Sequence, residues 1–508
     1  MRKTRLGRTA ALLTASTLLA AAAGAAELRI GLQEDPDKLD PTVARTFVGR
    51  IVFASLCDKL VDITPALDYV PQLATAWTLA DDGRTLTFEL RPNVRFHDGT
   101  PVDAAAVVAS LERHRTMKGS NRASEIRPVR KVVASGPLTV RLELDRPFAP
   151  LLAQLSDRAG MILSPTALAK AEAEGKDFAL QPVCAGPFRF KERVAQDRIV
   201  LERFADYWDK ERIALDRITF LPIPDQSVRL ANLQSGDLDL VERLAPQDLD
   251  QVRTDPRLSL VTIASQGYQG ITFNLGNGPR ARSPIGQKRE LREAFELALD
   301  RRILNEVAFQ GAHLVGNQPV SPENPYYHEG LPIPARDLER ARALVRAAGF
   351  ERVPVELMIP NNPEAQRVGE IVQAMTGEAG FDVKLLAIEF AAALDRQTKG
   401  DFEAFLIGWS GRTDPDGNIH VFTETNGALN DGKYSDPEVD RLLEEARLVS
   451  DPAARKKLYA RAFEIFVGRD RPRIYLYHQR WLWGLRKEVR GFVPYPDGLI
   501  RPQGITKG

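Results

Sequence analysis

The sequence predicts an α/β protein of two lobes, the first of which carries additional antiparallel strands. The length of 508 residues is too great for a single domain of ~150 residues. The second half alternates expected strands with expected helices, which indicates crossover connections and a mostly parallel sheet. The first half contains strict alternation of apolar and polar residues, the pattern of half-buried strands. A hydrophobic content of 44% and a charged content of 27% fit a folded globular chain.

Residues 1–25 predict a cleavable signal peptide. Four basic residues lie in the first eight positions, an apolar stretch runs from Ala10 to Ala23, and Ala23 and Ala25 precede a cut before Ala26. This order of basic, apolar and small residues is that of a secretory signal. Cleavage changes the net charge from +1 to −3 and leaves no cysteine at the new terminus to carry a lipid. We therefore expect an exported protein without a lipid anchor.

The first half is expected to begin with a strand at Glu27–Leu32. Thr85–Leu90 alternates strictly between apolar and polar residues and is bounded by turn residues, so it predicts a half-buried strand. Asp103 precedes an apolar pattern of helical spacing and is a suitable N-cap. Two further strands are expected at Leu138–Leu144 and around Ile199–Arg203.

In the second half, apolar residues recur first at helical and then at strand spacing. The expected helices cover residues 291–299, 338–349 and 364–379, and the expected strands cover Pro354–Ile359, Val383–Ile388 and Ala404–Ile407. Ser435 and Glu438 have the spacing of a capping box and predict the start of another helix.

The segment from Gly408 to Asn418 is a candidate binding site. It follows the expected strand Ala404–Ile407 and contains an aromatic residue, a guanidinium group, two carboxylates and three glycines within eleven residues. Ligands of open α/β sheets bind beyond the carboxyl ends of strands. The alternative is a turn with a buried Trp409 and local hydrogen bonds from Asp or Asn side chains.

Cys57 and Cys184 are the two cysteines of the chain. In an oxidising compartment such a pair favours a disulfide. The alternative is two buried free thiols, because unpaired cysteine is among the most buried residue types. Two cysteines without neighbouring histidines do not make a zinc site.

The sequence lacks the motifs of the common enzyme classes, and we predict a protein that is not an enzyme and holds no cofactor. Arg412 stands where the nucleophile-elbow pattern requires a glycine. The six histidines are scattered singly, so no metal site is predicted. A net charge of +1 offers no basic stripe for nucleic acid. The alternative is a secreted hydrolase that uses Asp414 and Asp416 for acid–base chemistry.

Several motifs in order along the chain resemble the bacterial extracellular solute-binding proteins of family 5, which include the oligopeptide-, dipeptide- and nickel-binding components of ABC importers. The longest runs from Leu73 to Pro101 and includes Leu90-Arg91-Pro92-Asn93-Val94-Arg95-Phe96-His97-Asp98-Gly99-Thr100-Pro101. The others are Cys184–Phe188, Leu233–Asp239, Phe273-Asn274, Arg292–Arg301 and Gly408-Trp409. His97 lies in a generic family motif, so the resemblance implies a structural role for it.

The resemblance implies a type II, cluster C-like periplasmic binding fold whose two lobes close on the ligand like a Venus flytrap. Lobe I would comprise residues 26–270 and 480–508, with an inserted subdomain at about 60–180, and lobe II residues 271–479. The hinge crossings would fall near Gly267–Leu275 and Ile474–Leu482. The implied setting is the periplasm. The implied partners are a small polar solute, membrane permease subunits and cytoplasmic ATPases, with the binding protein itself a monomer.

The resemblance also implies where a ligand would be contacted. Peptide binders of the family use a Trp-x-x-Asp arrangement whose Asp pairs with the peptide amine, whereas this chain has Trp409-Ser410-Gly411-Arg412. A guanidinium repels an ammonium group and favours a carboxylate or phosphate, so Arg412 is expected to meet an anionic group. It could equally pair with Asp414 or Asp416 as a structural bridge. The full set of candidate ligand contacts is Arg45, Thr46, Phe47, Tyr268, Gln269, Gly270, Trp409, Ser410, Gly411, Arg412, Asp414 and Asp416.

The leading interpretation is therefore a periplasmic binding protein for a small peptide or peptide-like solute, which could be anionic. The alternative within the same family is a binding protein for nickel or a metal chelate.

Overall fold

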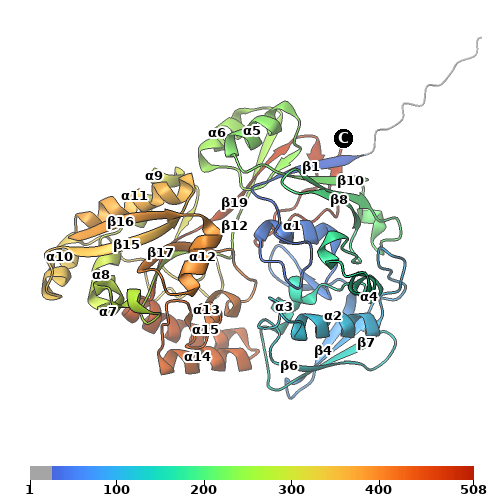
Figure 1. Cartoon of the computed structure of the whole chain (residues 1–508), viewed down its shortest axis with the longest axis horizontal. Coiled ribbons are helices and arrows are strands. Elements are labelled where there is room, and N and C mark those ends of the chain that lie inside the picture. Colours follow the sequence, from blue (N-terminus) through green and yellow to red (C-terminus); the bar gives the residue numbers. More distant parts are fainter. Residues whose placement is uncertain (1–25) are drawn as a thin grey trace, which may run out of the picture.

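The computed structural model describes residues 26–508, and its chain forms two lobes (Figure 1). The signal peptide expected at residues 1–25 lies outside the described residues. We define lobe I by a seven-stranded sheet and a separate four-stranded sheet, and lobe II by a six-stranded sheet. Figure 1 shows lobe I in blue and green and lobe II in yellow and orange, with β12 and β19 near the junction.

The seven-stranded sheet of lobe I has the order β12-β19-β11-β1-β10-β9-β8. Its strands are β12 (Leu258–Ala264), β19 (Arg480–Arg486), β11 (Leu240–Val241), β1 (Glu27–Leu32), β10 (Arg217–Pro222), β9 (Arg198–Arg203) and β8 (Phe188–Val194). The helices of this part are α1 (Phe47–Leu56), α5 (Gln226–Ser235) and α6 (Leu249–Thr254). The strands expected at Glu27–Leu32 and around Ile199–Arg203 are confirmed.

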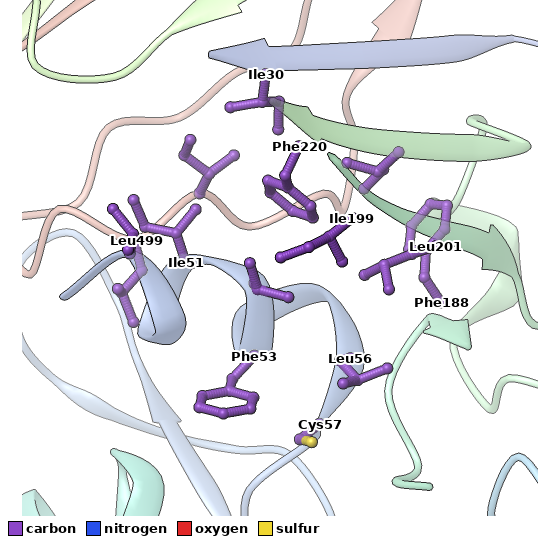
Figure 2. Packing of buried hydrophobic residues seen from close by; sticks show 14 of the residues in the cluster. Ile30, Ile51, Phe53, Leu56, Cys57, Phe188, Ile199, Leu201, Phe220 and Leu499 are labelled. Atoms are coloured by element: carbon purple, nitrogen blue, oxygen red, sulfur yellow. The ribbon is translucent and has the colours of Figure 1, made fainter. Parts of the chain in front are cut away.

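Helix α1 lies against this sheet and forms the main core of lobe I. In Figure 2 the side chains of Ile30, Ile199 and Phe220 point from the sheet toward Ile51 and Leu56 of the helix. All five are fully buried. Burial of large aliphatic side chains stabilises a fold by roughly 1.5–3 kcal/mol each, so α1 is held firmly to the sheet.

The four-stranded sheet of lobe I has the order β4-β5-β7-β6 and is antiparallel throughout. Its strands are β4 (Ala74–Leu79), β5 (Thr85–Leu90), β7 (Thr139–Leu144) and β6 (Val129–Ala134). The remaining elements here are the hairpin β2 (Val61–Ile63) and β3 (Tyr69–Pro71) and the helices α2 (Ala104–Thr116), α3 (Leu151–Leu155), η1 (Arg158–Gly160) and α4 (Pro165–Ala173). Asp103 caps α2 as expected, because its side chain accepts a hydrogen bond from Ala106 N at 2.9 Å.

The six-stranded sheet of lobe II has the order β14-β18-β13-β17-β15-β16. Its strands are β14 (Leu314–Val315), β18 (Arg473–His478), β13 (Tyr268–Phe273), β17 (Ala404–Trp409), β15 (Val353–Pro360) and β16 (Phe381–Ile388). The expectation of a mostly parallel sheet is wrong. Only β15 pairs in parallel, with β16 and β17, while the strands next to the lobe junction pair antiparallel.

Helices cover both faces and the lower end of the lobe II sheet. They are α7 (Pro284–Gln287), α8 (Arg289–Leu297), α9 (Arg301–Phe309), α10 (Leu338–Ala347), α11 (Pro363–Gly377), α12 (Phe390–Thr398), α13 (Asp416–Thr423), α14 (Pro437–Leu448) and α15 (Pro452–Phe463). The capping box expected at Ser435 is wrong by one residue. Asp436 caps α14 by accepting from Glu438 N and Val439 N at 2.9 and 3.0 Å, while Ser435 Oγ bonds Thr425 Oγ1.

The chain passes between the two large sheets twice. Residues 265–267 connect β12 to β13, and Gln479 alone separates β18 from β19. The lobes also touch elsewhere, because Arg146 pairs with Glu444 at 2.8 Å and Ala149 N donates to Arg447 O at 2.8 Å. The structure therefore has the two lobes in contact on more than one side.

Of the two alternatives for the cysteines, the structure has the disulfide, with an S–S distance of 1.98 Å. It joins the end of α1 to the segment before β8 across 127 residues of chain. The neighbouring His97 accepts from Cys184 N at 3.4 Å and bonds Gly186 O at 3.0 Å. His97 thus has structural contacts on both ring nitrogens.

We predict that loss of this disulfide lowers the free energy of unfolding by about 2–4 kcal/mol, because the bond restricts the unfolded chain. Urea titration of the protein with and without a reductant measures the difference. The double variant Cys57→Ala, Cys184→Ala serves as the control, since its stability should not respond to the reductant. Equal stability of the oxidised and reduced native protein would contradict the prediction.

We also predict that stability falls as the pH decreases from about 6.5 to about 4. Burial lowers the pKa of His97, His114, His313 and His478 to about 4, whereas histidine in an unfolded chain titrates near ~6.5. Between these values the unfolded chain binds protons that the folded protein does not, which favours unfolding. Burial raises the pKa of Asp58 to about 7, so this single group opposes the four histidines.

Urea titrations at pH 7 and pH 5 should show a loss of roughly 1 kcal/mol or more per pH unit. The variant His114→Gln should show a smaller loss, because the His114 ring is one of the four. A free energy of unfolding that stays constant or rises toward pH 5 would show that the histidines are protonated in the folded protein.

Candidate functional site

The loop after β17 is held by its own hydrogen bonds. Asn418 Oδ1 accepts from Trp409 Nε1 at 3.0 Å and from Arg412 N at 2.7 Å, and Asn418 Nδ2 donates to Arg412 O at 3.0 Å. Gly411 has a φ of +89°, and a Cβ there would lie 2.7 Å from the Cβ of Gln266. Local bonding from an Asn side chain therefore fixes the loop, and glycine is required where it meets residues 265–267.

Asp414 and Asp416 are each engaged by an arginine of lobe II. Arg455 donates to both oxygens of Asp414 at 2.6 and 2.7 Å. Arg447 donates to both oxygens of Asp416 at 2.8 and 3.3 Å. Two-pronged bonds of this kind use the carboxylate lone pairs that a ligand amine or a catalytic proton would need. These contacts argue against the hydrolase alternative for this loop.

Arg412 pairs with neither of the aspartates considered for it from the sequence. Its Nε lies 3.7 Å from Oδ2 of Asp157, which belongs to lobe I. Its guanidinium carbon lies 4.4 Å from the ring centre of Trp409, and Nη1 donates to Gly411 O at 2.8 Å. Burial lowers the pKa of Arg412 to about 10. Arg412 is thus the lobe II residue that faces charged groups of lobe I.

Asp157 is the lobe I carboxylate at this contact. Arg50 of α1 donates from Nε to Asp157 Oδ1 at 3.2 Å, and the ion pair from its Nη2 to Oδ2 measures 2.9 Å. Arg158 N donates to Oδ1 at 2.7 Å. Although burial acts in the opposite direction, the surrounding arginines hold the pKa of Asp157 well below its usual range. Asp157 is therefore a buried anion.

Two more arginines of lobe I complete the contact. Arg122 Nη1 donates to Glu125 Oε1 at 2.5 Å and Nη2 to Ala44 O at 3.3 Å. Arg158 Nη1 donates to the same Ala44 O at 2.8 Å. We call Arg50, Arg122, Arg158 and Arg412 the arginine cluster. All four side chains are at least nearly nine-tenths buried.

The lobe I residues expected to contact a ligand have mostly structural contacts. Thr46 caps α1 by accepting from Gly49 N at 3.3 Å, and the Arg45 backbone N donates to Asp37 at 2.8 Å while its side chain is exposed. Phe47 stacks on Trp481 of β19, with ring centres 4.7 Å apart. Only the start of α1 therefore lies near the lobe junction.

The β13 residues expected to contact a ligand belong to the lobe II sheet. Tyr268 is fully buried, and its hydroxyl accepts from Arg473. Gly270 pairs with Ile407 and leaves no room for a side chain beside Ile474. Gln269 is half-buried and pairs with Gly408, where its side chain occupies the space that a Cβ would take. Of the three, Gln269 is the one with an accessible polar side chain beside the loop.

Sequence reasoning missed Asp157, Gln266 and three of the four arginines. One signal was available, because Arg50 is the single charged residue in the apolar helix Phe47–Leu56. A lone charge in a helix that is buried on nearly all sides requires a partner. The other groups carried no signal, since Arg50 and Asp157 are 107 positions apart.

Two general searches of the described part of the chain found nothing. Residues 26–508 contain no group of three or more His, Cys, Asp or Glu side chains placed to hold a metal ion. Among these same residues, no helix has the length and apolar character needed to span a bilayer.

Comparison with known proteins places the chain among transport proteins. A family model described as bacterial extracellular solute-binding proteins, family 5, matches residues 68–430. The glutathione-binding protein GsiB of Pectobacterium atrosepticum is 28% identical over 475 residues, which are 91% of this chain and 90% of that protein. The dipeptide-binding protein of Escherichia coli is 27% identical over 475 residues, or 86% of each chain.

The fold is shared with solved structures. A dipeptide-binding protein of Pseudoalteromonas in complex with Met-Leu superposes with a TM-score of 0.85 at 22% identity, over 95% of this chain and 100% of that one. The predicted class, a two-lobed α/β periplasmic binding fold, is confirmed.

The buried pair of Asp414 and Arg455 gives a prediction. Asp414→Asn leaves the Arg455 charge buried without its counter-charge, so we expect a loss of roughly 3–5 kcal/mol in the free energy of unfolding. Asp250→Asn is the matched control, because the exposed Asp250 pairs with Arg253 at 3.0 Å, and exposed pairs contribute about 0–1 kcal/mol. Urea titration compares the two variants, and equal losses would refute the structural role of Asp414.

Proposed function

Because the chain belongs to the bacterial extracellular solute-binding proteins of family 5, we propose that it captures a small peptide or peptide-like solute between its lobes for an ABC importer. The relatives named for glutathione and dipeptides match it over most of their length. The single observation that supports the proposal best is the meeting of charged groups of both lobes, Arg412 and Asp157, at 3.7 Å beside the connection between the lobes.

The proposed mechanism is closure of two lobes about two connections. A ligand that contacts both lobes binds the closed form better than the open form, and so shifts the equilibrium toward closure. We propose lobe boundaries at 26–270 plus 480–508 and at 271–479, with an inserted subdomain at about 60–180. The short connections at residues 265–267 and at Gln479 are suitable places for the backbone to bend.

The proposed contacts from lobe II are Trp409, Ser410, Gly411 and Arg412, joined by Gln269. All of these except Gly411 are partly accessible. Trp409 offers an aromatic face, although Arg412 covers it at 4.4 Å in this structure. We do not extend the proposal to Asp414 and Asp416, since each is bonded by an arginine.

The setting that follows from this proposal is the periplasm, reached through the expected signal peptide. The protein would act as a monomer that binds without catalysis, and its closed form would be recognised by the permease subunits, which the ATPases drive.

The proposal predicts stoichiometric binding without turnover. A ligand present at 100 times its Kd adds about 2.7 kcal/mol to the free energy of unfolding, so a true peptide ligand should raise the Tm of the protein by a few degrees. A thermal-shift screen with glutathione and with di- and tripeptides identifies the ligand, calorimetry gives its stoichiometry, and mass spectrometry follows its integrity.

The expected results are one molecule bound per chain and an unaltered ligand after prolonged incubation. Hydrolysis of the peptide would favour an enzyme, and stabilisation by nickel or a nickel chelate alone would favour the metal alternative.

A further inference from the structure

The contact between the lobes contains more positive than negative charge. The arginine cluster supplies four positive charges, and the carboxylates among them are Asp157 and Glu125. The fields of these groups act on one another: Arg50, Arg412, Arg158 and Arg122 all act on the pKa of Asp157. Two positive charges therefore remain without a counter-charge within this group of six side chains.

Several N–H groups of the cluster are also unsatisfied. Arg50 Nη1, Arg122 Nε and Arg158 Nε are buried and have no hydrogen-bond partner among residues 26–508. A buried polar group without a partner costs about 1–3 kcal/mol, and more when it is charged. Burial lowers the pKa of Arg158 well below its usual value, which reflects the same cost. The cluster therefore offers donors that no group of the described chain uses.

Gln266 is a separate, uncharged observation at the same place. It lies in the 265–267 connection between the lobes and is only 5% exposed. Neither Nε2 nor Oε1 has a partner within the described chain. Its Cβ would lie 2.7 Å from a Cβ at Gly411, so Gln266 packs directly against the residue before Arg412. An unpartnered amide thus stands beside the unpartnered arginines.

We propose that the arginine cluster, with Gln266 beside it, binds a carboxylate of the solute, and that the protein selects solutes that present an anionic group here. This inference rests on the proposed function and names the class of its ligand. Guanidinium groups bind carboxylates through paired hydrogen bonds. An incoming carboxylate supplies both the missing negative charge and acceptors for the free N–H groups.

The same arrangement opposes an ammonium group at this position. A ligand amine would add a further positive charge to a buried site that already holds two in excess. Like charges at short distance in a poorly solvated region repel strongly. The end of the solute that reaches Arg412 is therefore its acidic end, and any amine of the solute lies elsewhere.

The test pairs a change in the ligand with a change in the protein. The probes are Ala-Ala and its C-terminal amide, glutathione and its glycyl ethyl ester, and succinate with succinamide. The protein is used in its mature form as wild type, Arg412→Gln and Arg302→Gln. Arg302 lies on the exposed face of α9, so its variant makes the same change of charge away from the site. Kd values come from calorimetry and Tm values from thermal shifts.

We expect the acidic member of a bound pair to bind wild type and Arg302→Gln at least tenfold more tightly than its neutral partner. Arg412→Gln should weaken the acidic member at least tenfold and leave the neutral member within threefold. A double cycle of this kind isolates the interaction between the two changed groups. A Tm of Arg412→Gln within a few degrees of that of Arg302→Gln excludes misfolding as the cause.

The remaining outcomes separate this inference from the proposed function. Acidic and neutral peptides that bind equally well, or that Arg412→Gln weakens equally, overturn the inference while the protein remains a peptide-binding protein. Stabilisation by succinate alone, lost in Arg412→Gln, supports the anion site and overturns the peptide proposal. No discrimination by charge in any pair overturns the inference.

Discussion

The structure depends on how positive charge is compensated where its two lobes meet. Arginine side chains of both lobes are buried together there, with fewer carboxylates than guanidinium groups. Burying an uncompensated charge is costly, because the loss of hydration exceeds what neighbouring dipoles return. Closure of the lobes around this contact is therefore unfavourable by itself. A ligand that carries negative charge removes the cost, and this couples binding to closure.

The path of the chain explains why such a contact can respond to a ligand. Arg50, Asp157 and Arg412 belong to segments that are far apart in sequence and lie in different lobes, joined only through two short connections. Within each lobe the polar groups of the site are firmly held, as Asn418 holds the Arg412 loop and Arg455 holds Asp414. Rigid lobes with flexible connections concentrate the change in free energy at the contact between them.

Local patterns in the sequence predicted local structure well. Asp103 was identified as a cap because capping needs only a side-chain oxygen near its own helix. Ser435 was chosen over Asp436 because both residues can cap, and only the contact of Ser435 with Thr425 decides between them. The parallel sheet was overestimated because β13 and β18 pair through long-range contacts. Arg412 was recognised by its place in a motif, whereas its partner Asp157 depends on tertiary structure alone.

The central claim is that uncompensated positive charge keeps the ligand-free lobes apart. Small-angle X-ray scattering of the mature protein at low ionic strength, with and without a saturating acidic ligand, tests it most directly. The account predicts a larger radius of gyration without the ligand and a compact form with it. A ligand-free protein that is already compact, and does not contract further when the acidic ligand binds, would contradict the account.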